Sequence, residues 1–101
     1  MSGFQQMLEQ ALKQKNMGVR ALEREIIRRY GTDKMISRSL ISDFRQGKRA
    51  PSYESALLIA EVLGIDKAAF LQAAFDLKIK LRQESERNRF VEFCNKNNIP
   101  I

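Results

Sequence analysis

Four glycines divide the first part of this chain into segments with helical periodicity. Gly18, Gly31, Gly47 and Gly64 each stand between runs whose apolar residues recur every three or four positions. Glycine favours turns and helix ends, because it adopts backbone conformations that side chains with a Cβ avoid. No run of β-branched residues alternates with polar ones, as a half-buried strand requires. The sequence therefore predicts an all-α fold.

The segments between these glycines predict five amphipathic helices. Their expected limits are about residues 4–15, 19–30, 38–46 and 53–63, and a fifth helix begins after its N-cap, Asp66. In the first segment Phe4, Leu8 and Leu12 lie on one helical face. Ser37 and Ser52 directly precede the third and fourth segments, where a side-chain oxygen can cap the helix.

The C-terminal part predicts an extended helix followed by a tail. Apolar residues at positions 70, 74, 77 and 81 repeat at close to 3.5 residues, and residues 82–89 are polar. A second apolar patch follows: Phe90, Val91, Phe93, Cys94, Ile99 and Ile101. This tail can fold back on the rest of the chain or pack against a second copy. We predict a homodimer, with Phe70, Leu77, Leu81, Phe90 and Phe93 at its interface.

The charge of the chain favours an acidic partner. The formal net charge is +6, and residues 20–49 contain nine basic and four acidic residues, so they carry +5 of it. Such an excess attracts nucleic acid or an anionic membrane. A membrane-surface role is a weak alternative, because the apolar stripe of the basic second segment is needed for the core. We expect no membrane-spanning helix, since the apolar runs are short.

The composition excludes several kinds of chemistry. The chain has one cysteine, Cys94, and no histidine, which excludes an internal disulfide, a Cys/His zinc site and a histidine-dependent triad. We therefore expect no enzymatic activity, no cofactor and no metal. The N-terminal residues lack the basic start and apolar core of a signal peptide. The expected location is the cytoplasm, in association with the nucleoid.

Residues 36–64 predict a short polar helix, a basic break and an apolar helix. The first of these helices presents small polar and charged side chains opposite its apolar face: Arg38, Ser39, Ser42, Asp43 and Arg45. Such side chains suit the reading of base edges in a DNA groove. Lys48 and Arg49 follow directly after Gly47, where basic side chains can hold phosphates. This segment predicts a DNA-binding protein.

The same segment resembles the XRE-type helix-turn-helix family of phage-repressor-like regulators. The similarity is densest in Ser37-Arg38-Ser39-Leu40-Ile41-Ser42, Phe44, Gln46-Gly47-Lys48-Arg49, Pro51 and Glu61-Val62-Leu63-Gly64. It covers residues 4–71 in outline and is specific over residues 37–64. The resemblance implies a helix-turn-helix domain over residues 1–72, with a helical extension over 73–101 for dimerisation or packing.

In that family the helix beginning near Ser37 is the recognition helix, which enters the major groove. The resemblance places Arg38, Ser39 and Ser42 at base-reading positions, and Lys48 and Arg49 at positions that contact the DNA backbone. We add Gly18, Arg20, Ser37 and Arg45 as candidate phosphate contacts. Arg45 can instead pair with a nearby acid.

The chain departs from the family pattern at three places. Val19 stands where the family usually has a phosphate-bracing glutamine, although the backbone amides of Gly18 and Val19 can still bind phosphate. Asp43 replaces a basic residue of many relatives; it can accept from a cytosine amino group or repel wrong contacts. The stretch between Leu22 and Ser37 is longer than usual, so it must extend the second helix or lengthen the turn.

The predicted function is sequence-specific regulation by a homodimer bound to an inverted repeat of double-stranded DNA. Two alternatives remain open. The first is a non-specific architectural DNA binder, which the net charge permits. The second is a protein-interaction adaptor, antitoxin-like or polymerase-binding, that uses the C-terminal tail or the long second helix, since helix-turn-helix folds can serve other roles.

Overall fold

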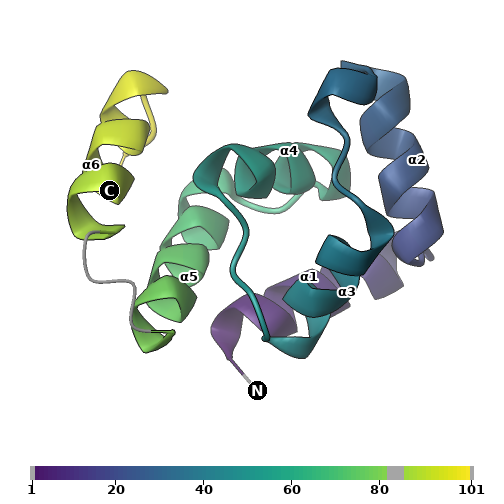
Figure 1. Ribbon diagram of the computed structural model, residues 1–101, viewed down its shortest axis with the longest axis horizontal. Helices are drawn as coiled ribbons and strands as arrows, with labels where there is room; N and C mark the ends of the chain where they lie inside the picture. The colour runs from purple at the N-terminus through teal and green to yellow at the C-terminus, as the bar shows by residue number, and fades with distance from the viewer. Residues whose placement is uncertain (1, 82–85, 101) are drawn as a thin grey trace.

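The computed structural model describes residues 2–81 and 86–100, and these residues form only helices and their connections (Figure 1). The elements are α1 (Gly3–Gln14), α2 (Val19–Tyr30), the 3-10 turn η1 (Thr32–Lys34), α3 (Arg38–Gln46), α4 (Tyr53–Leu63), α5 (Lys67–Lys80) and α6 (Glu86–Lys96). The all-α prediction is confirmed. The expected limits of α2, α3 and α4 match, and α1 lies one residue earlier than expected. Residues 82–85 of the polar stretch, and Ile101, lie outside the described residues.

Short-range caps set the ends of these helices. Ser37 Oγ accepts from the Leu40 amide at 3.3 Å, and Ser52 Oγ accepts from the Ser55 amide at 3.2 Å. Asp66 Oδ2 likewise accepts from the Ala69 amide. At the C-terminal ends of α3 and α4, Gly47 and Gly64 have φ angles of 73° and 70°. This left-handed conformation favours glycine, so these two residues stop their helices.

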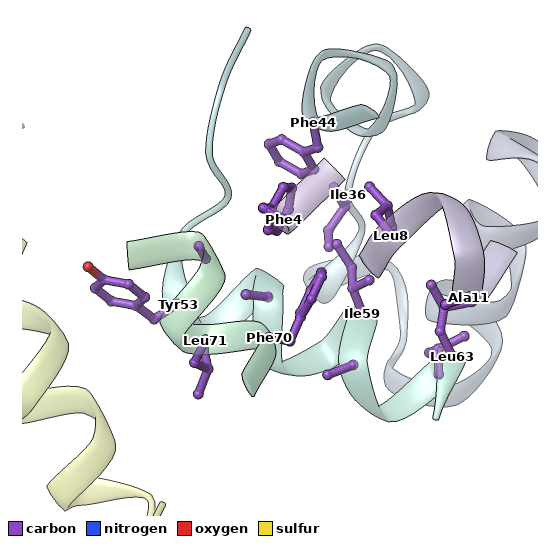
Figure 2. Close-up of a cluster of buried hydrophobic side chains, with 14 of the residues drawn as sticks. Phe4, Leu8, Ala11, Ile36, Phe44, Tyr53, Ile59, Leu63, Phe70 and Leu71 are labelled. Carbon is purple, nitrogen blue, oxygen red and sulfur yellow. The ribbon is translucent and has the colours of Figure 1, made fainter. Parts of the chain in front are cut away.

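One hydrophobic core joins the helices (Figure 2). The rings of Phe4 on α1 and Phe70 on α5 stack with their centroids 4.9 Å apart. Leu8, Ile41 and Ile59 bring α1, α3 and α4 into the same core, and each is fully buried. Burial of large apolar side chains is the main stabilising term of such a fold. The core thus fixes α3 by its inner face and leaves its outer face to solvent.

The C-terminal helix α6 folds back on α5 and on the start of α4. The Phe90 ring stacks on Phe75 with centroids 4.7 Å apart and lies 5.5 Å from the Tyr53 ring. Cys94 is buried beside it, and burial raises the pKa of its thiol. Lys78 Nζ lies 4.8 Å from the centre of the Tyr53 ring, a cation–π distance. Of the two arrangements considered for the tail, the described residues adopt the folded-back one.

This packing buries three of the five residues that were predicted to form the dimer interface. Phe70, Leu77 and Phe90 are buried within a single chain, so their side chains are not available to a second copy. Phe93 is half-buried against the core, whereas Leu81 follows the end of α5 and is 39% exposed. Helix α5 runs without interruption across the predicted domain boundary at 72/73, and one core includes residues from both sides of it.

Candidate nucleic-acid interface

Helix α3 presents the predicted base-reading residues on its side away from the core. Arg38 and Ser39 are exposed, and Ser42 and Asp43 are half-exposed. The residues on the opposite side of the helix, Ile41 and Phe44, are buried. Gln46 Nε2 donates to Ser42 Oγ at 3.3 Å, and Ser39 Oγ lies 3.3 Å from Ser37 Oγ. The outer surface of α3 is therefore polar, and it carries both donors and acceptors.

The residues predicted to contact phosphate lie at three places on the chain. Lys48 and Arg49 are exposed just beyond α3, and Arg49 Nε lies 3.7 Å from Asp43 Oδ2. Gly18 and Arg20 are exposed at the start of α2, where no side chain of the described residues caps the helix. The amides there remain free to meet an anion. The hydroxyl of Ser37 already serves as the cap of α3.

Arg45 forms an ion pair within the chain. Its Nε lies 2.6 Å from Glu9 Oε1 on α1, and its Nη2 lies 3.2 Å from Glu9 Oε2. The hydrogen bond from Arg45 holds the pKa of Glu9 below its usual value. Gln5 Nε2 also donates to the Arg45 carbonyl at 3.1 Å. Of the two roles considered for Arg45, the structure shows pairing with an acid, and this pairing ties the C-terminal end of α3 to α1.

The N-terminal end of α3 is held by Glu23 on α2. Glu23 Oε2 accepts from the Arg38 backbone amide at 3.1 Å, and Glu23 Oε1 lies 3.4 Å from Arg38 Nε. Sequence reasoning missed this residue, as it missed Gln5 and Glu9. No local pattern reveals such partners, because they are far from α3 along the chain.

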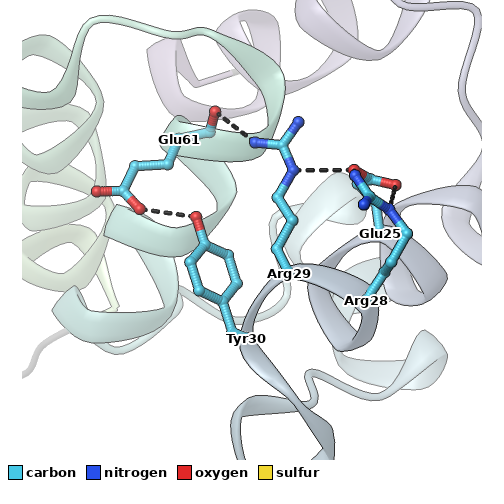
Figure 3. A network of polar contacts seen from close by, with 5 residues as sticks. All are labelled: Glu25, Arg28, Arg29, Tyr30 and Glu61. Atoms are coloured by element: carbon cyan, nitrogen blue, oxygen red, sulfur yellow. Dashed lines mark hydrogen bonds and ion pairs between the residues drawn. The ribbon is translucent and has the colours of Figure 1, made fainter.

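The stretch between Leu22 and Ser37 contains the rest of α2 and the turn η1. Helix α2 continues to Tyr30, and η1 follows Gly31. Figure 3 shows Arg29 and Tyr30 pointing toward Glu61 on α4, where Tyr30 Oη donates to Glu61 Oε2 at 2.7 Å. Lys34 Nζ lies 2.6 Å from Glu54 Oε1, also on α4. Contacts of Tyr30 and Lys34 therefore attach α2 and η1 to α4.

Two basic residues of α2 are engaged by a neighbouring acid. Glu25 pairs with Arg28 and with Arg29, whose Nε lies 2.9 Å from Glu25 Oε1. Hydrogen bonds from Arg28 and then Arg29 lower the pKa of the half-exposed Glu25 carboxyl to about 2. Part of the positive charge counted along residues 20–49 is therefore neutralised locally.

A groove of about 780 Å³ lies between α4 and α6. Its apolar lining includes Tyr53, Leu57, Leu58 and Phe93. The charged residues around it are Lys34, Glu54, Glu61, Arg89, Glu92 and Lys96. Over residues 2–81 and 86–100, no cluster of His, Cys, Asp and Glu could hold a metal ion. None of the helices in those ranges is long and apolar enough to span a membrane.

In a comparison with protein families, residues 8–70 match the HTH_3 helix-turn-helix model. Neither the curated proteins nor the solved structures gave a match. The matched residues run from α1 into α5, and they include α3 together with Glu9 of α1 and Glu23 of α2, which hold its two ends. They cover more than half of the chain, and they agree with the all-helical architecture. The chain therefore belongs to the XRE-type helix-turn-helix family of DNA-binding regulators.

Proposed function

We propose that the chain is a sequence-specific transcriptional regulator whose recognition helix is α3. One observation carries this proposal. The outer side of α3 bears a mixed set of polar side chains, while both ends of the helix are held by α1 and α2. A helix held in this way can present its side chains to the major groove in one orientation, which direct readout of base edges requires.

The exposed residues of α3 have distinct roles in this proposal. Arg38, at the N-terminal end, pairs with O6 and N7 of a guanine, a contact worth about 1–3 kcal/mol of discrimination. Ser39 and Ser42 donate to or accept from nearby base edges. Asp43 accepts from a cytosine amino group, with Arg49 beside it. This mixture favours specific readout over an architectural role, because the acidic side chain of Asp43 repels phosphates and would weaken binding to the DNA backbone alone.

The proposed phosphate contacts are Lys48, Arg49, Arg20 and the free amides after Gly18. These groups fix the position of the protein on the duplex without reading its sequence. They also make affinity fall with salt, since each neutralised phosphate releases counterions. The proposed location is the cytoplasm, in contact with the nucleoid.

We further propose that the regulator binds as a homodimer to an inverted repeat. Exposed apolar side chains near the end of α5 and on α6 support a contact between copies: Ile79, Leu81 and Val91. Two α3 helices related by a two-fold axis would read half-sites about 10 bp, or a multiple of this, apart. Light scattering on Leu81→Asp tests the interface: the variant should be monomeric where the parent is dimeric, and a monomeric parent would refute dimerisation.

Selection of bound duplexes from a random DNA pool at near-physiological salt tests the whole proposal. A two-fold symmetric motif supports the dimeric regulator. Enrichment of one isolated half-site retains specific binding but removes the dimer. Retained DNA without any enriched motif points to the architectural alternative, and a failure to retain DNA removes the proposed function.

A second candidate function is the binding of a protein partner, and the groove between α4 and α6 favours it. The apolar side chains of Leu57, Leu58 and Phe93 line this groove, and charges of both signs surround it. A Leu58→Lys variant would place a charge among these apolar side chains. Regulation lost in cells, with DNA binding unchanged in vitro, would support a partner there. Unchanged regulation would count against it.

A further inference from the structure

Both carboxylate oxygens of Glu23 are directed to a single residue of the recognition helix. Oε2 accepts from the Arg38 backbone amide at 3.1 Å, and Oε1 lies 3.4 Å from the Nε atom of the same residue. The Glu23 side chain is 20% exposed, and that of Arg38 is 53% exposed. The contact thus joins a partly enclosed acid on α2 to an arginine that faces solvent at the start of α3.

This contact changes the electrostatics at the N-terminal end of α3. The first amides of a helix usually attract an anion such as a phosphate. Here Glu23 accepts from the Arg38 amide, and the Ser37 hydroxyl accepts from the Leu40 amide. The carboxylate also brings a negative charge to the same place. A DNA phosphate would therefore meet two amides that are already bonded and an anion that repels it.

The contact also changes what the Arg38 guanidinium binds best. A guanidinium has five N–H donors, so an ion pair at Nε leaves the Nη1 and Nη2 hydrogens for another acceptor. A phosphate at those hydrogens would place a second negative charge close to Glu23. The O6 and N7 atoms of guanine are uncharged acceptors and bring no such repulsion. Pairing with Glu23 therefore weakens the attraction of Arg38 for phosphate more than its attraction for guanine.

We propose that Glu23 is a positioning residue that determines specificity by reserving Arg38 for a base. This inference rests on the proposed function, because it presumes that α3 enters the major groove. Glu23 itself contacts no DNA in this account. It acts through Arg38, and it lowers affinity for unselected DNA while it supports preference at one guanine of each half-site.

A comparison of Glu23→Gln with the parent protein tests this role. The glutamine keeps an oxygen that can cap the Arg38 amide, but it loses the charge. We expect the Glu23→Gln variant to bind unselected DNA more tightly than the parent does. Its affinity should also fall more steeply with salt, by the slope of about one additional phosphate contact. The ratio of affinities for selected and unselected duplexes should fall roughly fivefold, the lower end for one base contact. Preference for guanine should weaken at the position that Arg38→Ala also affects.

A matched control separates this effect from a change of net charge. Asp76→Asn removes the same charge from an exposed position on α5, and it should leave the affinity ratio unchanged. The double variant with Glu23→Gln and Arg38→Ala should show the specificity of Arg38→Ala alone, because Glu23 acts only through Arg38.

The outcomes are distinguishable. A parent protein without any sequence preference would remove the proposed function itself. A parent with preference, and a Glu23→Gln variant with the same affinity ratio, would overturn only the role of Glu23. An equal loss of affinity for both DNAs would also overturn it, since that is the result expected of simple structural support. Partial unfolding scales both affinities together, so the ratio stays informative even if the variant is less stable.

Discussion

The Tyr30 hydroxyl donates a hydrogen bond of 2.7 Å to Glu61 Oε2 and joins the end of α2 to α4, 31 residues apart in the chain. Burial, and then the hydrogen bond to Glu61, raises the pKa of Tyr30. The same hydrogen bond is the main reason that the pKa of Glu61 is lowered. The residues that lengthen α2 are thereby attached to the domain rather than left as a free extension.

Replacement of Tyr30 by phenylalanine should lower the free energy of unfolding by about 1–2 kcal/mol, because the Glu61 carboxylate loses a partly buried donor. The pKa of Tyr30 is higher in the folded chain than in the unfolded one, so its contribution is complete below the usual pKa near 10 and is lost as the pH rises through the raised value. Urea unfolding between pH 7 and pH 11 measures both effects. This account would be contradicted if Tyr30→Phe and the parent lost the same unfolding free energy between pH 7 and pH 11.

Replacement of Gly47 by alanine should destabilise the domain more than the same change at Gly64. Both glycines have positive φ angles, so both variants carry similar backbone strain. At Gly47 the added Cβ would also lie 2.7 Å from Gln5 Oε1, whereas nothing lies within 4 Å at Gly64. We expect about 1 kcal/mol of loss for Gly64→Ala, and a larger loss for Gly47→Ala.

Thermal unfolding of both glycine variants and of the double variant Gln5→Ala with Gly47→Ala checks this prediction. Removal of the Gln5 side chain relieves the contact, so the double variant should lose less stability than the sum of the single changes. Additive losses would show that the side chain of Gln5 moves away at no cost.

Replacement of Phe90 by alanine should cost about 3–5 kcal/mol of unfolding free energy, the usual range for a buried phenylalanine. Its ring is 5% exposed and stacks on Phe75. Val91, the next residue, is 39% exposed, and its change to alanine should cost less than about 0.5 kcal/mol. Chemical denaturation of both variants measures the difference. Equal small effects would mean that α6 does not stay on α5 in solution.

Arg38→Ala and Lys48→Ala should affect DNA binding in different ways. Loss of Arg38 should remove about 1–3 kcal/mol of preference at one base of each half-site. Loss of the exposed Lys48 side chain should weaken binding evenly across sequences and reduce the salt slope by about one. The backbone amide of Lys48 bonds to the Asp43 carbonyl, and this bond survives the change. Affinity measurements on duplexes that differ at single positions distinguish the two patterns, and matching patterns would refute the division of roles.

Local signals in the sequence were sufficient to predict the helices from residue 19 to residue 63. Ser37 and Ser52 cap the helices that begin directly after them, and Gly47 and Gly64 end the helices that precede them. The partners in these interactions are only a few residues apart, so a short stretch of sequence contains both of them. The family motif over residues 37–64 likewise lies within one continuous stretch.

The contacts that hold α3 could not be predicted in this way. Glu23 and Glu9 are ordinary acidic residues on the surfaces of predicted helices. No neighbouring residue in the chain indicates that Glu23 pairs with Arg38, or Glu9 with Arg45. Arg45 shows the consequence: its sequence position allowed either phosphate binding or an ion pair, and only the packing of α1 against α3 brought Glu9 within 2.6 Å.

The sequence by itself determined that this chain is helical, where the helices between residues 19 and 63 begin and end, and which polar residues α3 would expose. The tertiary structure decided what each apolar face covers. Periodicity marked Phe70, Leu77 and Phe90 as apolar, yet the packing buries them within one chain. Hydrophobic burial is non-directional. An apolar stripe therefore indicates that a helix face must be covered, but it does not indicate which surface covers it.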